Sequence, residues 1–335
     1  MSEVVDALLS PNAYDEDVTE AIKLLQTHIS YVFLTGRYAY KIKKPVDFGF
    51  LDFTTLEKRK FYCEEELRVN RRLAEDMYLE VVPINKSRGK IAVKGAGNTV
   101  EYAVKMKEFP QECIMTNMLE ENKVKGEHIE EIARTLAEFH SRAATGEGVD
   151  VYGVLEQVSA NWIQNFDQTR HLRGGLIDSG TFDNIEDRVL GFLEREKEVF
   201  KGRVAAGKVR ECHGDVHSGN IFIVDNRTHI FDAIEFNKAF SCSDVASEIA
   251  FLTMDLEFHG RLDFADLVTA MYVKYGGDEG IIELLPFYKC YRAYVRAKVS
   301  GFKLQDMGIA GKERRRSEDL IKRYFELALK YANAI

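Results

Sequence analysis

The sequence predicts an α+β protein of two lobes, a small sheet-rich lobe followed by a larger, mainly helical one. Strand-like runs separated by turns dominate up to residue 109, and helical periodicity dominates beyond Pro110. A length of 335 residues suits two domains or one large bilobal domain. We therefore expect an N-terminal lobe at 1–109 and a C-terminal lobe at 110–335.

The N-terminal lobe is expected to contain a sheet of five strands and one long helix. Runs rich in β-branched and aromatic residues predict the strands. These runs are YVFLTG, RYAYKIKKP, EVVPI, KIAVK and VEYAVKMKEF. Residues 54–73 carry apolar side chains at helical spacing among dense charge, which predicts the helix. We also expect helical turns at 5–27 and a hairpin turn at GAGN, residues 95–98.

The C-terminal lobe is expected to be helical except for a short β insert at 221–236. Helical periodicity is clear in EHIEEIARTLAEFHSRA, in FDNIEDRVLGFLEREKEVF and in DVASEIAFLTMDLEF. Asp244 is the first residue of the last of these segments and is expected to cap the N-terminus of its helix. Arg292, Arg296 and Lys298 lie on a late helix, where charged side chains are expected to face solvent, with a substrate or phosphate contact as the alternative.

Composition narrows the class of protein. The formal net charge of -8 argues against nucleic acid or an anionic membrane as the main partner. No signal peptide is recognisable at the start, and no stretch approaches the ~20 apolar residues of a membrane span. The five cysteines are scattered without CxxC spacing, which is typical of reduced thiols and not of a disulfide framework or zinc site. We expect a cytoplasmic globular protein, and the oligomeric state stays open.

A dense polar loop, HGDVHSGN at residues 213–220, is the main candidate for chemistry. Three interpretations compete for it. GDVHS resembles part of a dimetal phosphatase motif, but the other His and Asn ligands of such a site are missing. A polar turn without chemistry is the second interpretation, and a phosphoryl-transfer loop is the third.

Spacing favours phosphoryl transfer. Such a loop needs a carboxylate that accepts the proton of the attacking hydroxyl, and an amide and a second carboxylate that hold magnesium. Asp215 and Asn220 are five residues apart, as in the HRDLxxxN loop. A predicted strand pair then leads to Asp232, so a hairpin that begins at Asn220 returns with a second metal ligand. We assign Asp215 as the base and Asn220 and Asp232 as the magnesium ligands.

HGDVHSGN followed by IFDAIEF resembles the catalytic segment of the aminoglycoside phosphotransferase and choline kinase group. The resemblance extends from about residue 28 to about residue 300. The segments SYVFLTGRYAYKIKKPVDFGFLDF, FDAIEFN and LPFYKCYRAYVRAKV are similar to a bacterial and archaeal subfamily of kinases related to aminoglycoside phosphotransferases. The resemblance implies a protein-kinase-like bilobal fold and the use of ATP and Mg2+.

The resemblance also implies a strand lysine that holds the ATP phosphates and a helix glutamate that orients it. Lys41 is the candidate lysine, with Lys43 on the same strand face as its rival. Glu66 is the candidate glutamate, with Glu65 as the alternative. Ser30, in the short THIS loop, is expected to help hold phosphate.

The remaining expectations concern the hinge and the acceptor. Backbone groups near Lys107 and Phe109 are expected to contact adenine. Glu235, Asp255 and Glu257 are the acidic groups expected to bind a polyhydroxyl or amine-bearing acceptor.

The predicted function is ATP- and Mg-dependent phosphoryl transfer to a hydroxyl of a small molecule. A kinase-like module that binds nucleotide without turnover and a metal-dependent hydrolase are the alternatives. The literal DFG at 47–49 precedes the loop by too many residues to bind the metal, and is expected to form a turn.

Overall fold

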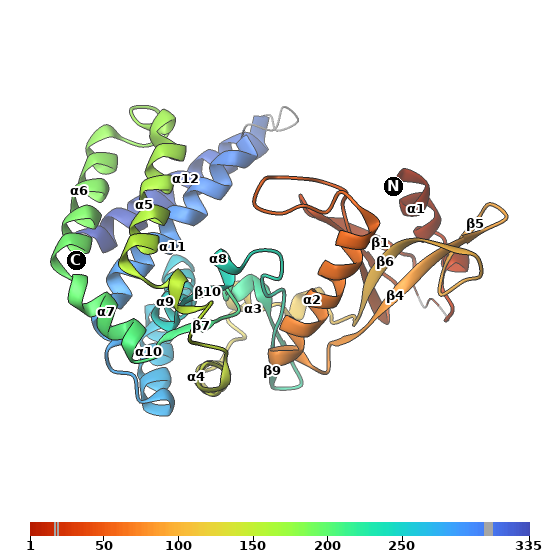
Figure 1. Ribbon diagram of the computed structural model, residues 1–335, viewed down its shortest axis with the longest axis horizontal. Helices are drawn as coiled ribbons and strands as arrows, with labels where there is room; N and C mark the ends of the chain where they lie inside the picture. The colour runs from red at the N-terminus through yellow and green to blue at the C-terminus, as the bar shows by residue number, and fades with distance from the viewer. Residues whose placement is uncertain (17, 19, 305–310) are drawn as a thin grey trace. The chain divides into compact units, whose positions relative to one another are not determined.

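The computed structural model describes residues 1–16, 18, 20–304 and 311–335 (Figure 1). The chain divides into two compact units. Unit 1 consists of Met1–Glu121 and Gly219–Ser241, and unit 2 consists of Asn122–Ser218 and Cys242–Ile335. The lobes predicted at 1–109 and 110–335 stay a prediction.

Unit 1 is built on an antiparallel sheet with the strand order β1-β2-β3-β6-β4-β5. The strands are β1 (Lys23–Gln26), β2 (Ser30–Leu34), β3 (Tyr38–Lys43), β4 (Tyr78–Ser87), β5 (Lys90–Val93) and β6 (Asn98–Lys107). The sheet therefore has one strand more than predicted. The extra strand is β1, which pairs with β2. Strand β1 lies in the segment 5–27, which was expected to form helical turns, so that expectation is wrong for 23–26.

The predicted hairpin at GAGN is also wrong. Strand β5 pairs with β4, and β6 pairs with β4 on the other side, so β5 and β6 are not neighbours. Gly97 serves a different purpose, because it has a φ of +104° and a Cβ there would lie 2.1 Å from the carbonyl oxygen of Lys86. Only glycine fits where the chain passes this close to the neighbouring backbone.

The two faces of the sheet are covered by different elements. Along β3, Tyr40 and Ile42 belong to the core beneath α1 (Ser2–Leu8) and η1 (Pro11–Ala13). Ala39 belongs to the opposite core, which includes residues of α2 (Leu56–Ala74). Because side chains alternate along a strand, Lys41 and Lys43 lie on the same face as Ala39.

Several short elements complete unit 1. They are η2 (Gln111–Cys113), α3 (Met115–Glu120), the paired strands β8 (Ile221–Val224) and β9 (Arg227–Ile230), and α8 (Lys238–Ser241). Phe222 of β8 packs into the same core as Cys63 of α2. The DFG segment forms the expected turn, in which the Gly49 N–H donates to Asp47 Oδ1 at 2.8 Å.

Unit 2 is a helical assembly. Its longer helices are α4 (Gly126–Arg142), α5 (Leu155–Thr169), α6 (Ser179–Arg195), α7 (Lys197–Ala205), α9 (Val245–Phe258), α10 (Leu262–Gly276), α11 (Ile281–Leu304) and α12 (Gly311–Ala332). Its short elements are η3 (Asp150–Tyr152), η4 (Arg170–Leu172), β7 (Val209–Glu211) and β10 (Cys242–Asp244), and η5 (Ser218–Asn220) leads on to unit 1 in sequence.

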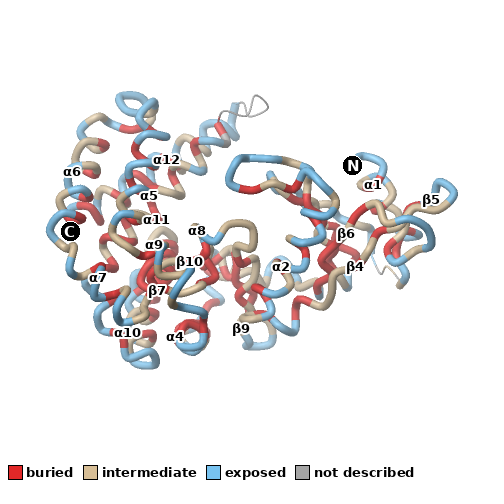
Figure 2. The backbone as a smooth tube through the Cα atoms, viewed as in Figure 1, coloured by how far each residue is buried: buried red, intermediate tan, exposed pale blue. Residues whose placement is uncertain are grey.

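Helix α9 forms the centre of unit 2. It packs against α10 and α11, and its residues from Val245 to Leu256 are buried (Figure 2). Its predicted cap is confirmed, since Asp244 Oδ1 accepts the Ala246 N–H at 2.8 Å. Among the described residues, no helix combines the length and apolar character that crossing a membrane requires.

Candidate active site

Five charged residues of unit 1 form a lysine cluster, which we define as Lys41, Lys43, Glu66, Asp232 and Glu235. Glu66 is buried on α2 and binds both lysines, with Oε1 at 2.8 Å from Lys41 Nζ and Oε2 at 2.8 Å from Lys43 Nζ. Lys41 Nζ also lies 2.6 Å from Asp232 Oδ1, and Lys43 Nζ lies 2.5 Å from Glu235 Oε1. One helix carboxylate thus holds two strand lysines, and each lysine reaches one further carboxylate.

Strand and helix periodicity create this cluster. The buried face of α2 includes Cys63, Glu66 and Asn70, at spacings of three and four residues. Glu65, one residue earlier, is partly exposed and pairs with Arg68 at 2.9 Å. Glu66 is therefore the helix carboxylate that contacts the lysines.

The two lysines differ in surroundings. Lys43 is almost fully buried, and so is its partner Glu235, whereas the side chain of Asp232 is 44% exposed. Burial alone would lower the pKa of Lys41, but Asp232 and Glu66 outweigh it and hold this pKa well above its ordinary value. Of the two, Lys41 is the lysine whose carboxylate partner is accessible to solvent.

Asp232 adopts a backbone conformation that is uncommon for residues other than glycine, with a φ of +64°. Neighbouring elements hold it there. Its N–H donates to the hydroxyl of Tyr78 at 3.2 Å, and the next N–H, of Ala233, donates to Asn70 Oδ1 at 2.8 Å. A local strain that α2 and β4 both maintain is typical of a functional position.

The β8–β9 hairpin brings Asn220 close to the Asp232 segment. Ile221 pairs with Ile230, and the Phe231 N–H donates to the Asn220 carbonyl at 3.0 Å. Asn220 therefore precedes one strand, and Asp232 follows the other by two residues. Both predicted metal ligands lie at the same end of one hairpin.

The other predicted nucleotide contacts are also in unit 1. Ser30 begins β2 opposite Lys43; its N–H donates to the Thr27 hydroxyl at 2.9 Å, and its own hydroxyl is buried. The Lys107 N–H donates to the Met77 carbonyl at 2.8 Å. The ring of Phe109 lies 4.8 Å from that of His229.

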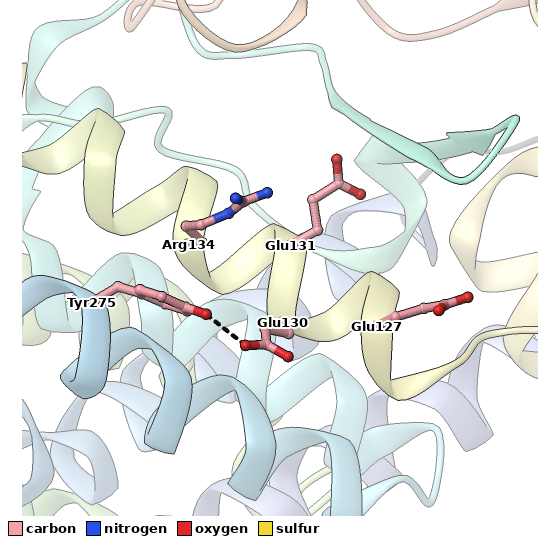
Figure 3. Close-up of a pocket in the computed structure, with 5 residues that line it drawn as sticks. All are labelled: Glu127, Glu130, Glu131, Arg134 and Tyr275. Atoms are coloured by element: carbon pink, nitrogen blue, oxygen red, sulfur yellow. Dashed lines mark hydrogen bonds between the residues drawn. The ribbon is translucent and has the colours of Figure 1, made fainter.

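Lys107 and Phe109 also line a cavity of about 380 Å3. Its remaining lining residues are Asp76, Val224, Asp225, Arg227 and His229. Unit 2 has a separate cavity of about 250 Å3 on α4, in which Tyr275 donates to Glu130 at 2.5 Å (Figure 3). No residue predicted for the site lines this second cavity.

Asp215 lies in the part of the polar loop that belongs to unit 2, and its side chain is 35% exposed. Its N–H donates to His213 Nδ1 at 3.3 Å, and its Oδ2 lies 3.7 Å from His217 Nε2. Burial acts to raise the pKa of Asp215, but His217 and then Arg296 and His213 outweigh it and hold the pKa below its ordinary range. The carboxylate is therefore ionised at neutral pH.

Buried side chains hold the peptide of Gly214, next to Asp215, on both sides. Glu248 Oε1 accepts the Gly214 N–H at 2.6 Å, and Arg292 Nη1 donates to the Gly214 carbonyl at 3.1 Å. Glu248 Oε2 lies 2.7 Å from His140 Nε2. We call Glu248, Arg292 and His140 the Gly214 clamp. Gly214 has a φ of +90°, so the clamp stabilises a turn that favours glycine.

The clamp corrects one expectation. Arg292 was expected to face solvent, but it is only 8% exposed, because its guanidinium points inward and donates to the Gly214 carbonyl. His140, Cys212 and Glu248 lie close enough together to hold a metal ion. Protein contacts occupy these groups instead, since Glu248 binds His140 and Gly214, and Cys212 Sγ donates to the Ser243 carbonyl at 3.6 Å.

The two predicted acceptor residues of unit 2 have protein partners. Asp255 Oδ2 accepts the Ser218 N–H at 2.8 Å. Glu257 lies 2.7 Å from Lys289 and 2.8 Å from Lys330.

Four important contacts were not predicted from the sequence, those of Asn70, Tyr78, Glu248 and Arg292. A usable signal existed for one of them. Glu248 is a charged residue within the apolar run of α9, and a buried charge in such a helix needs a partner.

Three solved structures share the fold of this chain. A choline/ethanolamine kinase family protein from Mesorhizobium loti matches with a TM-score of 0.53 at 14% identity, over 98% of this chain and 99% of that one. A microcompartment-associated aminopropanol kinase matches with 0.55 at 12% identity, over 99% and 98%. The GDP complex of aminoglycoside 2'-phosphotransferase-IIIa matches with 0.51 at 13% identity, over 93% and 94%.

These matches confirm the predicted resemblance at the level of fold. The chain has the protein-kinase-like α+β fold found in choline/ethanolamine kinase family proteins and aminoglycoside phosphotransferases.

Closer relatives exist in sequence. Three uncharacterized proteins, one of Mycobacterium bovis and two of Mycobacterium tuberculosis strains, are 33% identical to this chain over 278 residues. The match covers 83% of this chain and 54% of each relative, so the chain spans about half the length of these relatives. No protein-family model matches the chain.

Proposed function

We propose that the protein is a small-molecule kinase, which transfers the γ-phosphoryl group of ATP to a hydroxyl with the help of Mg2+. One observation carries the proposal: Lys41 joins Glu66 of α2 to Asp232 at the end of the β8–β9 hairpin. A lysine held by a helix carboxylate beside a metal-binding aspartate is the arrangement that a kinase needs for the phosphates and the metal. A cytoplasmic location is part of the proposal and rests on the cysteine pattern.

The residues of unit 1 would hold the nucleotide. Lys41 would bind its phosphates, with Glu66 fixing the ammonium group. Backbone groups near Lys107 and Phe109 would contact the base, and Ser30 would lie near the phosphates.

Asn220 and Asp232 suit magnesium because Mg2+ prefers carboxylate and amide oxygens. The accessible Asp232 carboxylate and the neighbouring Asn220 supply that donor set. When bound, the ion neutralises charge on the phosphate oxygens.

Asp215 would act on the acceptor. Its carboxylate would orient the acceptor hydroxyl and accept its proton as that oxygen forms a bond to the γ-phosphorus. The bond from the γ-phosphorus to the bridging oxygen breaks in the same step, and ADP leaves. Since the low pKa of Asp215 makes it a weak base, orientation is its larger contribution.

Measuring ADP formation with a panel of hydroxyl-bearing metabolites tests this proposal. We expect ADP formation that requires both Mg2+ and one class of acceptor, and that falls by about 10²–10⁴-fold in Asp215→Asn. Nucleotide binding without turnover would favour the binding-module alternative. Phosphoester hydrolysis without ATP would favour the hydrolase.

A further inference from the structure

The charges around Asp215 differ from those expected for a cationic acceptor. Asp255 accepts a loop N–H, and Glu257 is bound by two lysines. These carboxylates already contribute to the structure of unit 2. Among the charged groups that act on Asp215, the one that remains to be explained is a cation, Arg296.

Helix geometry places Arg296 beside the loop. Arg292 lies on the same face of α11 one turn earlier, and its guanidinium donates to the Gly214 carbonyl at 3.1 Å. Arg296 follows at the next turn, where its charge interacts with those of Asp215 and Asp255. Arg296 thus lies on the face of α11 that contacts the loop of Asp215, close enough for its charge to act on that carboxylate.

Arg296 is held by a neutral group. Its Nε donates to the hydroxyl of Tyr324 at 3.4 Å, and Tyr324 stacks on Phe258 with ring centroids 4.1 Å apart. Within the part of the chain that the structure describes, its two Nη groups have no hydrogen-bond partner. An arginine that only balanced Asp255 would be expected to form a bidentate pair with it. Instead, the Tyr324 hydroxyl holds Arg296 through Nε and leaves both Nη groups available to a ligand.

We propose that Arg296 binds an anionic group of the phosphate acceptor, a carboxylate or a phosphate, and so directs the acceptor hydroxyl toward Asp215. This inference rests on the proposed kinase function and names its substrate class. A guanidinium fork matches both anions through two parallel N–H···O bonds. It replaces the expectation that acidic groups bind a polyhydroxyl or amine-bearing acceptor.

Matched acceptors test the inference. Glycerol, glycerate and glycerol 3-phosphate share a diol and differ in the anionic group, and ethanolamine supplies a cationic alcohol. ADP formation is measured with these compounds and with a wider panel of hydroxy acids, sugar phosphates, neutral polyols and amino alcohols. We expect the reactive acceptors to be anionic, and the hydroxy acid and phosphate arms identify which anion is bound.

Variants of Arg296 supply the second readout. Arg296→Gln should raise the KM of the reactive anionic acceptor about 10–100-fold, the range for losing a charge-assisted hydrogen bond. Its kcat with saturating acceptor and its affinity for Mg-ATP should change little. Arg323→Gln is the matched control, because it removes an exposed arginine whose Nη2 contacts the Phe258 carbonyl instead. If Arg296→Gln does not fold, Arg296→Lys keeps the charge and should raise the same KM about tenfold or less.

Two results would overturn the inference. In the first, a neutral or cationic alcohol is the best acceptor, which leaves the kinase function standing. In the second, Arg296→Gln lowers kcat equally for all acceptors with KM unchanged, so the arginine only positions Asp215.

If no alcohol supports turnover, the kinase function fails while the inference can still be tested. Calorimetric titration of the anionic panel members into wild type and Arg296→Gln then decides the inference alone. Binding that Arg296→Gln loses supports it, and an absence of binding to wild type contradicts it.

Discussion

The lysine cluster of unit 1 and the Gly214 clamp of unit 2 hold charged groups in place by different means. In the cluster, the charged side chains come from a strand, a helix and the segment after a hairpin, and they bind one another directly through ion pairs of 2.5–2.8 Å. In the clamp, Asp215 sits on a loop, and buried side chains grip the backbone beside it. Regular elements position side chains by themselves, whereas a loop needs its peptide groups held.

This difference separates the expected effects of mutation. Changes in the cluster should alter stability and nucleotide binding together, because in the proposed site the same ion pairs would serve both. Changes in the clamp should alter turnover with little effect on nucleotide binding, because the clamp acts on the loop that carries Asp215.

The largest effect on stability is expected for Lys43→Met. The substitution leaves Glu235 and one oxygen of Glu66 buried without their cation, which costs about 3–5 kcal/mol. Urea denaturation measures the loss. Lys43→Met combined with Glu235→Leu should recover part of the loss. Lys58→Met, at an exposed pair with Asp52, should change stability far less than Lys43→Met. A loss below 1 kcal/mol for Lys43→Met would show that the cluster does not stabilise unit 1.

The next effect concerns Glu248 and pH. Burial acts to raise the pKa of Glu248, but the hydrogen bond and charge of His140 lower it from 4.5 to about 2. Because the folded-state pKa is depressed, the stabilisation is present above the unfolded value and is lost as pH falls from 4.5 to about 2. Its size is on the order of 3 kcal/mol.

Glu248→Gln should therefore flatten the dependence of unfolding free energy on pH in that window. Its amide oxygen can still accept the Gly214 N–H, so the variant should retain more turnover than Glu248→Ala. We expect kcat to fall about 10–100-fold in Glu248→Gln with the Kd of Mg-ATP unchanged. A pH profile identical to that of wild type, or a weakened Mg-ATP affinity, would contradict the separation of clamp from cluster.

A smaller effect is expected for Asn70→Ala. Asn70 Nδ2 donates to the Glu66 carbonyl at 2.9 Å while its Oδ1 accepts the Ala233 N–H at 2.8 Å. Its loss leaves a buried N–H without a partner beside Asp232, which costs about 1–3 kcal/mol. Thermal unfolding gives the stability change, and Asn70→Asp, which keeps the acceptor, should retain more of it. Equal losses in the two variants would show that the bond to Ala233 contributes nothing.

Much of the lysine cluster could be predicted from the sequence, because strand and helix periods are local. Alternation along residues 38–43 places both lysines on one face, and helical spacing places Glu66 on the buried face of α2. The hairpin that brings Asn220 and Asp232 together was readable from the strand pair that separates them. Local periodicity could not distinguish the roles of Lys41 and Lys43, because the two lysines differ only in their tertiary contacts with Asp232 and Glu235.

The clamp could not be predicted in the same way. Its contacts join Gly214 to residues 34 and 78 positions away, and no local pattern encodes such pairs. Strand β1 was missed for a related reason. Its sequence, KLLQ, shows no alternation, and pairing with β2 alone makes it a strand.

The central claim is that Asp232 serves the metal and nucleotide while Asp215 serves the acceptor. Titrating Mg-ATP by calorimetry into Asp232→Asn and Asp215→Asn tests this division most directly. Asp232→Asn should bind Mg-ATP at least about tenfold more weakly than wild type, because it loses a charge that faces the cation. Asp215→Asn should bind Mg-ATP like wild type. Wild-type affinity in Asp232→Asn together with lost affinity in Asp215→Asn would contradict the account.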